Sequence, residues 1–196
     1  MSHVKNTIVL SVFISLSFAT ILAQQPPAAA VHIESGTWIN VAPADAGFTV
    51  LLPARASEKA TPVEGRPGVE NYTLTLDTKL AGYVVSYAEF PDDVTDPNAI
   101  KGMLDRGREG GIATTGAKLE SEKEIKLNGY FGREWVLELP GGLFATARAY
   151  WVKRRLYQTV FIIAPNASDP PEVTKLRRET ATKFLDSFTL SGEVSK

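Results

Sequence analysis

Alternation of apolar and polar positions predicts several strands along this chain. Over 70–76, Tyr72, Leu74 and Leu76 share one face and threonines occupy the other, which is typical of a strand with one buried face. The run over 83–90 is apolar on both faces and predicts a central strand of the sheet. Shorter apolar runs predict strands at 38–41 and 48–52.

The strictest alternation lies over 119–127, where Leu119, Ile125 and Leu127 are expected on one face of a strand. The residues expected on the opposite face are Glu120, Glu122, Glu124 and Lys126. Asn128–Gly129 follows at once, and this pair is the strongest short signal for a β-hairpin. We expect the return strand over 130–139, and further strands over 144–153 and 156–164.

The segment 54–68 is polar and contains Pro62 and Pro67. Proline cannot donate to a sheet ladder, and polar stretches with proline and glycine are typical of loops. We therefore predict a mobile loop over 54–68, at one edge of the sheet.

Asp96 precedes Pro97, and this order predicts the start of a helix. Aspartate can accept hydrogen bonds from the free N–H groups of a helix start, and proline loses nothing at the first helical position. Glycine is a poor helix residue, so the helix should end by Gly110–Gly111. Its expected buried residues are Ile100, Met103 and Leu104.

A second helix is expected near the carboxyl end, with Asp169 as its cap and Glu172 at the capping-box position. Pro170 and Pro171 should lie in its first turn. One stripe at helical spacing should be buried, and it consists of Val173, Leu176, Thr180, Phe184 and Phe188. The polar face carries Lys175, Arg178, Glu179 and Lys183.

The predicted order is strands, a helix, four strands joined by tight turns, and a second helix. Strands joined by hairpins pair antiparallel, and helices that stand apart from the strand runs indicate the α+β class. We therefore predict one α+β domain over 36–191, a central antiparallel sheet flanked by helices, with a short tail at 192–196.

The first residues predict export. Residues 1–23 combine a weakly basic start, an apolar run over 8–22 and Ala23 as a small residue for cleavage, as in a signal peptide. The apolar run is shorter than the ~20 residues that cross a bilayer as a helix. An uncleaved membrane anchor is the alternative. Residues 24–35 are expected to form a flexible lead-in, and the mature domain to be periplasmic or secreted.

Composition narrows the function classes. The chain is 44% hydrophobic and 22% charged, as in an ordinary globular protein, and it contains no cysteine. Thiol nucleophiles and zinc–thiolate sites are therefore excluded. The formal net charge is -1, so no basic excess points to nucleic acid. No basic amphipathic helix points to a membrane surface, and we expect no stable membrane insertion after cleavage of the leader.

Four phrases carry a resemblance to a known family: FTVLLP over 48–53, YVVSYAEFP over 83–91, LYQTVFI over 156–162 and KFLDSFTL over 183–190. With the order of elements, they resemble the PsbP-like proteins and uncharacterised exported bacterial proteins of that type. The resemblance implies a central antiparallel sheet with helices packed against it. It also implies a non-catalytic binding or assembly module, with no active site and no cofactor to carry over.

Candidate chemistry is sparse. His32 is the only histidine after residue 23, and it lies in the expected lead-in rather than at a rigid position. Asp92, Asp93 and Asp96 lie close enough in sequence to bind a cation, although their spacing is not that of an EF-hand loop and Asp96 already caps a helix. We predict no catalytic, cofactor or metal residues, and the cation alternative stays open.

The leading hypothesis is a non-enzymatic exported module that binds an unidentified protein partner through its sheet edge or loops, foremost the segment 54–68 and the hairpin tip at Arg154. The candidate partner or ligand surface consists of Tyr83, Tyr87, Trp135, Arg148, Arg154 and Arg155. One alternative is a carrier of a small apolar ligand, in a cavity lined by Tyr83, Tyr87 and Trp135. The other is a hydrolase that uses paired carboxylates such as Glu134 and Glu138.

Overall fold

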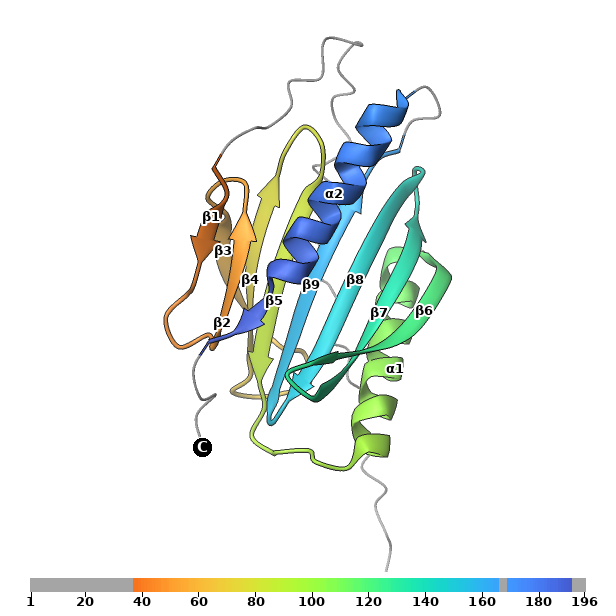
Figure 1. The fold of residues 1–196 in the computed structure, drawn as a ribbon. Helices are drawn as coiled ribbons and strands as arrows, with labels where there is room; N and C mark the ends of the chain where they lie inside the picture. Colours follow the sequence, from red (N-terminus) through yellow and green to blue (C-terminus); the bar gives the residue numbers. More distant parts are fainter. Residues whose placement is uncertain (1–36, 166–168, 192–196) are drawn as a thin grey trace, which may run out of the picture.

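The computed structural model describes residues 37–165 and 169–191, and in them two antiparallel sheets and two helices (Figure 1). The larger sheet contains, in spatial order, β3 (Ser57–Pro62), β4 (Glu70–Asp77), β5 (Gly82–Glu89), β9 (Arg155–Ile163), β8 (Leu143–Val152), β7 (Tyr130–Leu139) and β6 (Lys118–Leu127). The smaller sheet contains β1 (Ile39–Val41), β2 (Phe48–Leu52) and β10 (Thr189–Leu190). The helices are α1 (Pro97–Thr115) and α2 (Pro171–Ser187). The predicted α+β class is confirmed.

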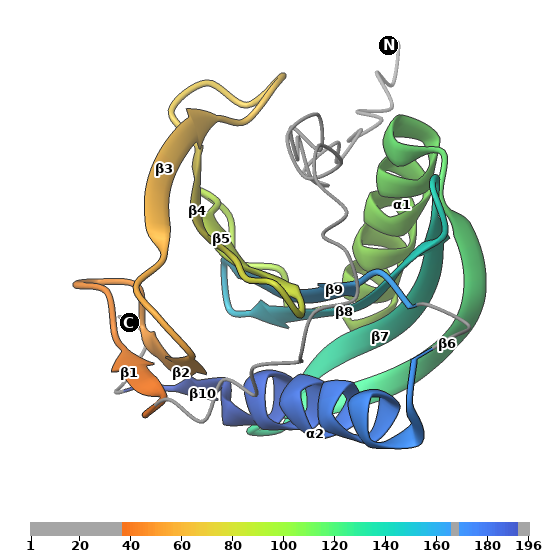
Figure 2. The same cartoon turned by 90° about the horizontal axis from the view of Figure 1, so that it is seen from above.

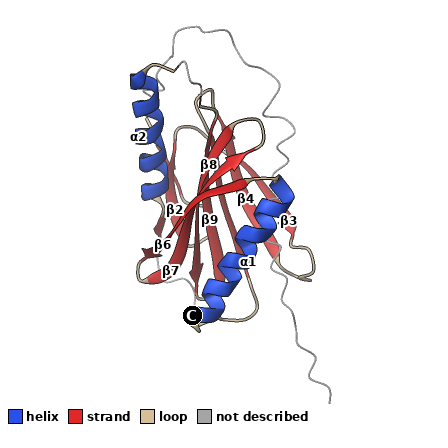
Figure 3. Ribbon diagram, turned by 90° about the vertical axis from the view of Figure 1, so that its right-hand side faces the viewer, coloured by secondary structure: helices blue, strands red, loops and turns tan. Residues whose placement is uncertain are grey.

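The helices cover opposite faces of the curved larger sheet (Figures 2 and 3). Helix α1 packs on the face that carries Trp135 and Val160, and it buries Leu104 there. Helix α2 and the smaller sheet share the other face, where Phe184 and Phe48 are buried against Tyr83 and its neighbours. Each face therefore has its own apolar core, and the larger sheet separates them.

Local signals placed most of the strands correctly. Strand β5 is central, between β4 and β9, as its two apolar faces predict. Asn128 and Gly129 form the turn between β6 and β7 with φ of 49° and 87°, and two positive φ values are what a type I′ hairpin turn requires. Asp96 caps α1 by accepting from the backbone N–H groups of Asn98 and Ala99.

The segment 54–68 was wrongly predicted to be a loop, because it contains β3, an edge strand paired along its whole length with β4. Nearly all of its residues are exposed, so no alternation of buried and exposed positions marked it as a strand. Pro62 is its last residue, where a missing N–H does not interrupt the ladder. Lysine, glutamate and proline on an edge strand discourage pairing with other chains.

Helix α1 was also predicted too short. It continues through Gly110 and Gly111 to Thr115 and ends at Gly116, which caps it in the left-handed conformation with φ of 69°. Gly107 and Gly111 are buried within the helix. Packing against the sheet outweighs the low helix propensity of glycine, and ~1 kcal/mol per glycine is a small term beside the burial of an apolar helix face.

Strand β6 differs from its prediction at a bulge. The register with β7 shifts between Leu119 and Ser121, so the residues before and after the shift point to opposite faces. Leu119 pairs with Leu137 on the α1 face and is 37% exposed. Ile125 and Leu127 pack on the α2 face, so the expected common face of the three residues is wrong.

The start of α2 was misassigned as well. Pro170 is the N-cap residue and makes no side-chain cap hydrogen bond, while the carboxylate of Asp169 pairs with Arg177 instead. Of the predicted stripe, Val173, Phe184 and Phe188 are buried. Leu176 and Thr180 are only half-buried.

Four tyrosines form a row across the α2 face of the larger sheet. Tyr72, Tyr87, Tyr157 and Tyr150 lie directly opposite one another on β4, β5, β9 and β8, and the next position in the row, on β7, is Gly132. The smaller sheet and the end of α2 pack on this row. The ring of Phe48 lies edge-on to Tyr157 at 5.9 Å, and the residue after α2, Phe188, stacks on Tyr150 at 6.1 Å between centroids.

Candidate binding site

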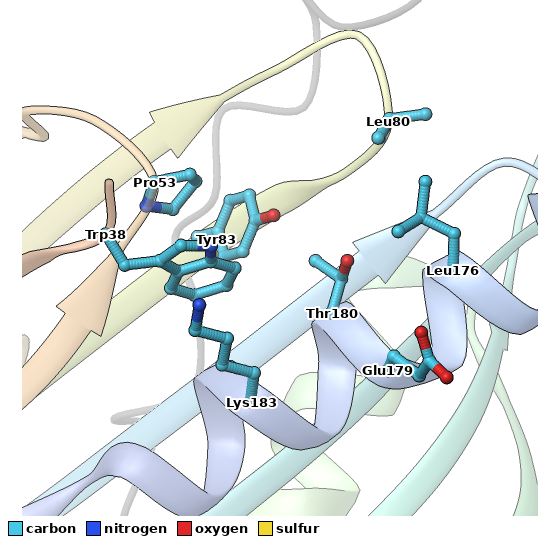
Figure 4. A pocket seen from close by; sticks show the side chains of 8 residues that line it. All are labelled: Trp38, Pro53, Leu80, Tyr83, Leu176, Glu179, Thr180 and Lys183. Atoms are coloured by element: carbon cyan, nitrogen blue, oxygen red, sulfur yellow. The ribbon is translucent and has the colours of Figure 1, made fainter. Parts of the chain in front are cut away.

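A partly open cleft of about 230 Å³ lies between α2 and the ends of β1, β2 and β5 (Figure 4). We call it the α2 cleft. Its floor is apolar and consists of Trp38, Pro53, Leu80, Tyr83 and Leu176. Its rim is polar, comes from α2 and consists of Glu179, Thr180 and Lys183. A concave surface with an apolar floor and a few polar groups is the usual form of a binding site.

The walls of the cleft come from parts of the chain that are far apart in sequence. Trp38 directly precedes β1, and Pro53 directly follows β2, where its missing N–H ends the strand. Leu80 lies in the turn between β4 and β5. Because the smaller sheet and α2 pack side by side on the larger sheet, these residues meet only in the folded protein.

Tyr83 is a fixed wall of the cleft, since its side chain is 1% exposed. Its ring is edge-on to the rings of Trp38, Phe161 and Phe184, at centroid distances of 6.2, 5.4 and 5.2 Å. Edge-to-face contacts of this kind stabilise aromatic clusters beyond the area that they bury. The floor of the cleft is therefore preorganised.

Lys183 bends over the indole of Trp38, with Nζ 4.5 Å from the ring centroid. A cation over an aromatic face is attracted by the ring quadrupole, and indole is the best of the aromatic acceptors. The contact holds the ammonium group at the mouth of the cleft, beside the apolar floor (Figure 4).

The structure separates the three aromatic residues of the predicted ligand cavity. Tyr83 lines the α2 cleft, whereas Tyr87 stacks on Tyr72 in the tyrosine row at 5.0 Å, and partial burial raises the pKa of Tyr87. Trp135 is 1% exposed and lies in the core on the α1 face. A cavity lined by all three is not formed, because Trp135 and Tyr83 point to opposite faces of the sheet.

Arg148 on β8 links α2 to the larger sheet through two hydrogen bonds. Its Nε donates to Glu134 on β7 at 2.6 Å, and one terminal nitrogen donates to Asp186 on α2 at 2.7 Å. Burial lowers the pKa of Arg148, but the hydrogen bonds to Glu134 and Asp186 outweigh it and leave the pKa raised. The guanidinium is thus occupied by structural partners.

Arg154, in the β8–β9 turn, and Arg155, the first residue of β9, share the carboxylate of Glu89 at the end of β5. Arg155 also donates to the carbonyl oxygen of Asp45 at 2.8 Å, and its side chain is only 11% exposed. Arg154 is more accessible, with 47% of its side chain exposed. Both arginines connect strands and loops at the end of the sheet.

The two glutamates of the hydrolase alternative each have a cation. Glu134 is paired with Lys123 at 2.7 Å and with Arg148, and Glu138 with Lys118 at 3.6 Å. Burial raises the pKa of Glu134, but the hydrogen bonds from Lys123 and Arg148 outweigh it and hold the pKa below its ordinary value. A general acid needs the opposite shift.

No group of three or more histidine, cysteine, aspartate or glutamate side chains in the described part of the chain could hold a metal ion. Of the three aspartates considered for a cation site, Asp92, Asp93 and Asp96, the last caps α1. His32, the expected leader and lead-in, and the tail at 192–196 lie outside the described residues. Within 37–165 and 169–191, neither helix is both long and apolar enough to span a membrane.

Of the six residues predicted for a partner or ligand surface, Tyr83 alone is among the residues that line the α2 cleft. Trp38 was assigned to the first strand, and Glu179 and Lys183 to the solvated face of the second helix. One signal was present, because Leu176, Thr180 and Lys183 follow one another at the four- and three-residue spacings of a single helix face. Nothing local indicated that this face would meet Trp38.

No protein-family profile and no curated protein sequence matches the chain. Among solved structures, cyanobacterial PsbP (CyanoP) from Synechocystis sp. PCC 6803 matches over 86% of this chain and 98% of its own, with 15% identity and a TM-score of 0.54. The fold is therefore PsbP-like, and the predicted resemblance is confirmed at the level of the fold.

Two further bacterial structures are similar over long stretches. PA94 from Pseudomonas aeruginosa, a protein of unknown function, matches over 76% of this chain and 96% of its own, with 14% identity and a TM-score of 0.41. A protein from Bacteroides thetaiotaomicron VPI-5482 matches over 82% of this chain and 50% of its own, with 13% identity and a TM-score of 0.43.

Proposed function

We propose that the protein is a non-enzymatic, exported binding module that engages a partner protein through the α2 cleft. The observation that carries this proposal is the cleft itself, with a preorganised aromatic floor and a polar rim. By contrast, Arg148, Arg155 and Glu134 bind one another or neighbouring segments. Aromatic residues set in a pocket and surrounded by polar groups are typical anchors of protein–protein interfaces.

The size of the cleft favours an inserted side chain over a free ligand. Its volume of about 230 Å³ is below the ~300–1,000 Å³ of most small-molecule sites. It exceeds the ~150 Å³ of an engineered cavity that accepts benzene. One aromatic or aliphatic side chain from a partner fits this range, and a carrier of larger apolar ligands does not.

The exposed edges of the larger sheet are a weaker candidate for the binding surface. Edge strand β3 carries Glu58, Lys59 and Pro62, and the opposite edge strand, β6, carries three lysines and three glutamates. Charges and proline on edge strands oppose the addition of a further strand. This pattern favours the α2 cleft over the sheet edge as the place where a partner docks.

Site-specific photo-crosslinking in the cells that make the protein tests the proposal. A benzoylphenylalanine at Thr180, which lines the cleft, should form an adduct with a discrete protein. The same group at Thr182, an exposed position on the same helix outside the cleft, is the matched control and should not. Equal adducts from both positions, or none from Thr180, would remove the α2 cleft as the docking site.

Export is tested separately. We expect the protein outside the cytoplasm, with an amino terminus that begins near Gln24 when the mature protein is sequenced. Membrane-bound protein that still starts at Met1 would replace the exported module with an anchored one.

A further inference from the structure

The ammonium group of Lys183 contacts the aromatic floor of the α2 cleft at Trp38. Its Nζ lies 4.5 Å from the centroid of Trp38, and no carboxylate in the described part of the chain pairs with it. Two other cations of α2 are engaged, since Lys175 pairs with Glu179 and Arg177 with Asp169. The positive charge of Lys183 is therefore available to a partner.

The acidic group of the rim lies toward the other end of the cleft. Glu179 is one helical turn before Lys183, and its carboxylate is 3.7 Å from Lys175, outside the cleft. Figure 4 shows it pointing away from Trp38 and Lys183, with Thr180 between. The ammonium group of Lys183 therefore lies beside the aromatic floor, whereas the carboxylate of Glu179 points away from it (Figure 4).

We propose that the α2 cleft recognises an acidic–apolar segment of the partner protein. An apolar side chain of the partner packs on the half-buried floor residues Trp38, Leu80 and Leu176, and a carboxylate next to it in sequence accepts a hydrogen bond from Lys183 Nζ. This inference rests on the proposed binding function and adds the chemistry of the partner to it. Charge complementarity with the cation at the cleft is the reason to assign an acidic partner.

The two contacts contribute differently. The apolar side chain removes aromatic surface from water and supplies most of the affinity. Lys183 is exposed, so its ion pair is screened and contributes modestly. Removing the partner's carboxylate should weaken binding about three- to fivefold, as expected of an exposed ion pair. The apolar contact thus provides affinity, and the lysine provides preference for an acid.

Synthetic peptides can separate these contributions. The probe is acetyl-Ser-Gly-Phe-Asp-Gly-Ser-amide, compared with versions in which asparagine replaces the aspartate or serine replaces the phenylalanine. The indole N–H signal of Trp38 reports binding in NMR titrations. It is distinguishable from the signals of the other two tryptophans, Trp135 and Trp151, which are 1% and 2% exposed.

We expect the Phe-Asp peptide to bind most tightly, the Phe-Asn peptide about three- to fivefold more weakly, and the Ser-Asp peptide not measurably. Lys183→Met should abolish the difference between the first two peptides, and Lys183→Arg should restore it. The control Arg178→Met removes an exposed cation of the same helix that does not line the cleft, and it should preserve the difference. Glu179→Gln should strengthen binding of the acidic peptide, because it removes a like charge from the rim.

The outcomes distinguish this inference from the function on which it rests. Equal affinities for the Phe-Asp and Phe-Asn peptides would overturn the acidic preference and leave the α2 cleft as an apolar docking site. Weaker binding of the acidic peptide by the Glu179→Gln variant would also overturn it. Absence of any peptide response at Trp38, together with absence of crosslinks at Thr180, would remove both proposals.

Discussion

The close approach of β7 and β8 at Gly132 makes a sharp prediction about stability. A Cβ atom at Gly132 would lie 2.5 Å from Cδ1 of Tyr150 and 2.6 Å from the backbone oxygen of Ala149. The ring cannot move aside freely, because it is 5% exposed and stacked on Phe188. Nor can the oxygen, because it belongs to the neighbouring strand of the sheet. Gly132→Ala should therefore strain the tyrosine row at its end.

The magnitude follows from two opposing effects. Overpacking of a well-packed core costs ~1–3 kcal/mol, and contacts this short place Gly132→Ala near the upper end. Replacing glycine by alanine also reduces the entropy of the unfolded chain, which stabilises by ~0.4–1 kcal/mol. The net loss in the free energy of unfolding should be about 2 kcal/mol, or roughly 4–8 °C in Tm for a domain of this size.

Urea unfolding followed by circular dichroism measures this change. Gly110→Ala is the matched control, because a Cβ at Gly110 meets no atom within 4 Å and the residue lies inside α1. It should stabilise the protein by ~0.5–1 kcal/mol. The reasoning fails if Gly132→Ala is as stable as the wild type, or if both variants change stability in the same direction.

Three further predictions concern buried groups. Thr159 is 0% exposed, and its hydroxyl has no hydrogen-bond partner among the described residues. Thr159→Val should therefore stabilise the protein by ~1 kcal/mol in urea unfolding. A loss of stability would contradict this. Phe184 is 0% exposed and packs against Tyr83 and Phe161. Phe184→Ala should therefore lower the free energy of unfolding by ~3–5 kcal/mol. A change below ~1 kcal/mol would mean that the packing of α2 on the sheet does not depend on this side chain. Burial raises the pKa of Glu134 in the folded protein, but the hydrogen bonds from Lys123 and Arg148 outweigh it and hold the pKa below its ordinary value. The unfolded chain therefore binds this proton more readily than the folded protein does. Stability should fall as the pH decreases below ~4.3. Thermal unfolding should show that Glu134→Gln, although less stable at pH 7, loses less stability than the wild type between pH 5 and pH 3, and parallel losses would exclude Glu134 as a contributor.

The candidate site was the part of the protein least accessible from the sequence. Tyr83 was predicted to belong to a partner or ligand surface; it lines the α2 cleft but is only 1% exposed. Its partners there are Trp38 and Lys183, which are separated from it and from each other by long stretches of chain. Arg148 and Arg155 were predicted to belong to the partner or ligand surface, whereas in the structure they pair with Asp186 and Glu89, which are distant in sequence.

The sequence by itself determined the elements whose signals are local. The strand over 70–76, the Asn128–Gly129 turn and the Asp96 cap each depend on interactions within a few residues, and the structure has all three, although Tyr72 of the expected buried face is 42% exposed. Together they were enough to predict the α+β class. These features are readable because their physical cause lies inside a short window of chain.

Only the tertiary structure decided the features that depend on distant neighbours. Strand β3 forms because its backbone pairs with β4. Helix α1 continues through Gly110 and Gly111 because packing on the sheet buries its inner face. The bulge at Leu119 depends on pairing with β7, and the α2 cleft depends on the smaller sheet meeting α2. In each case the stabilising contact joins segments far apart in the chain, so no local pattern could specify it.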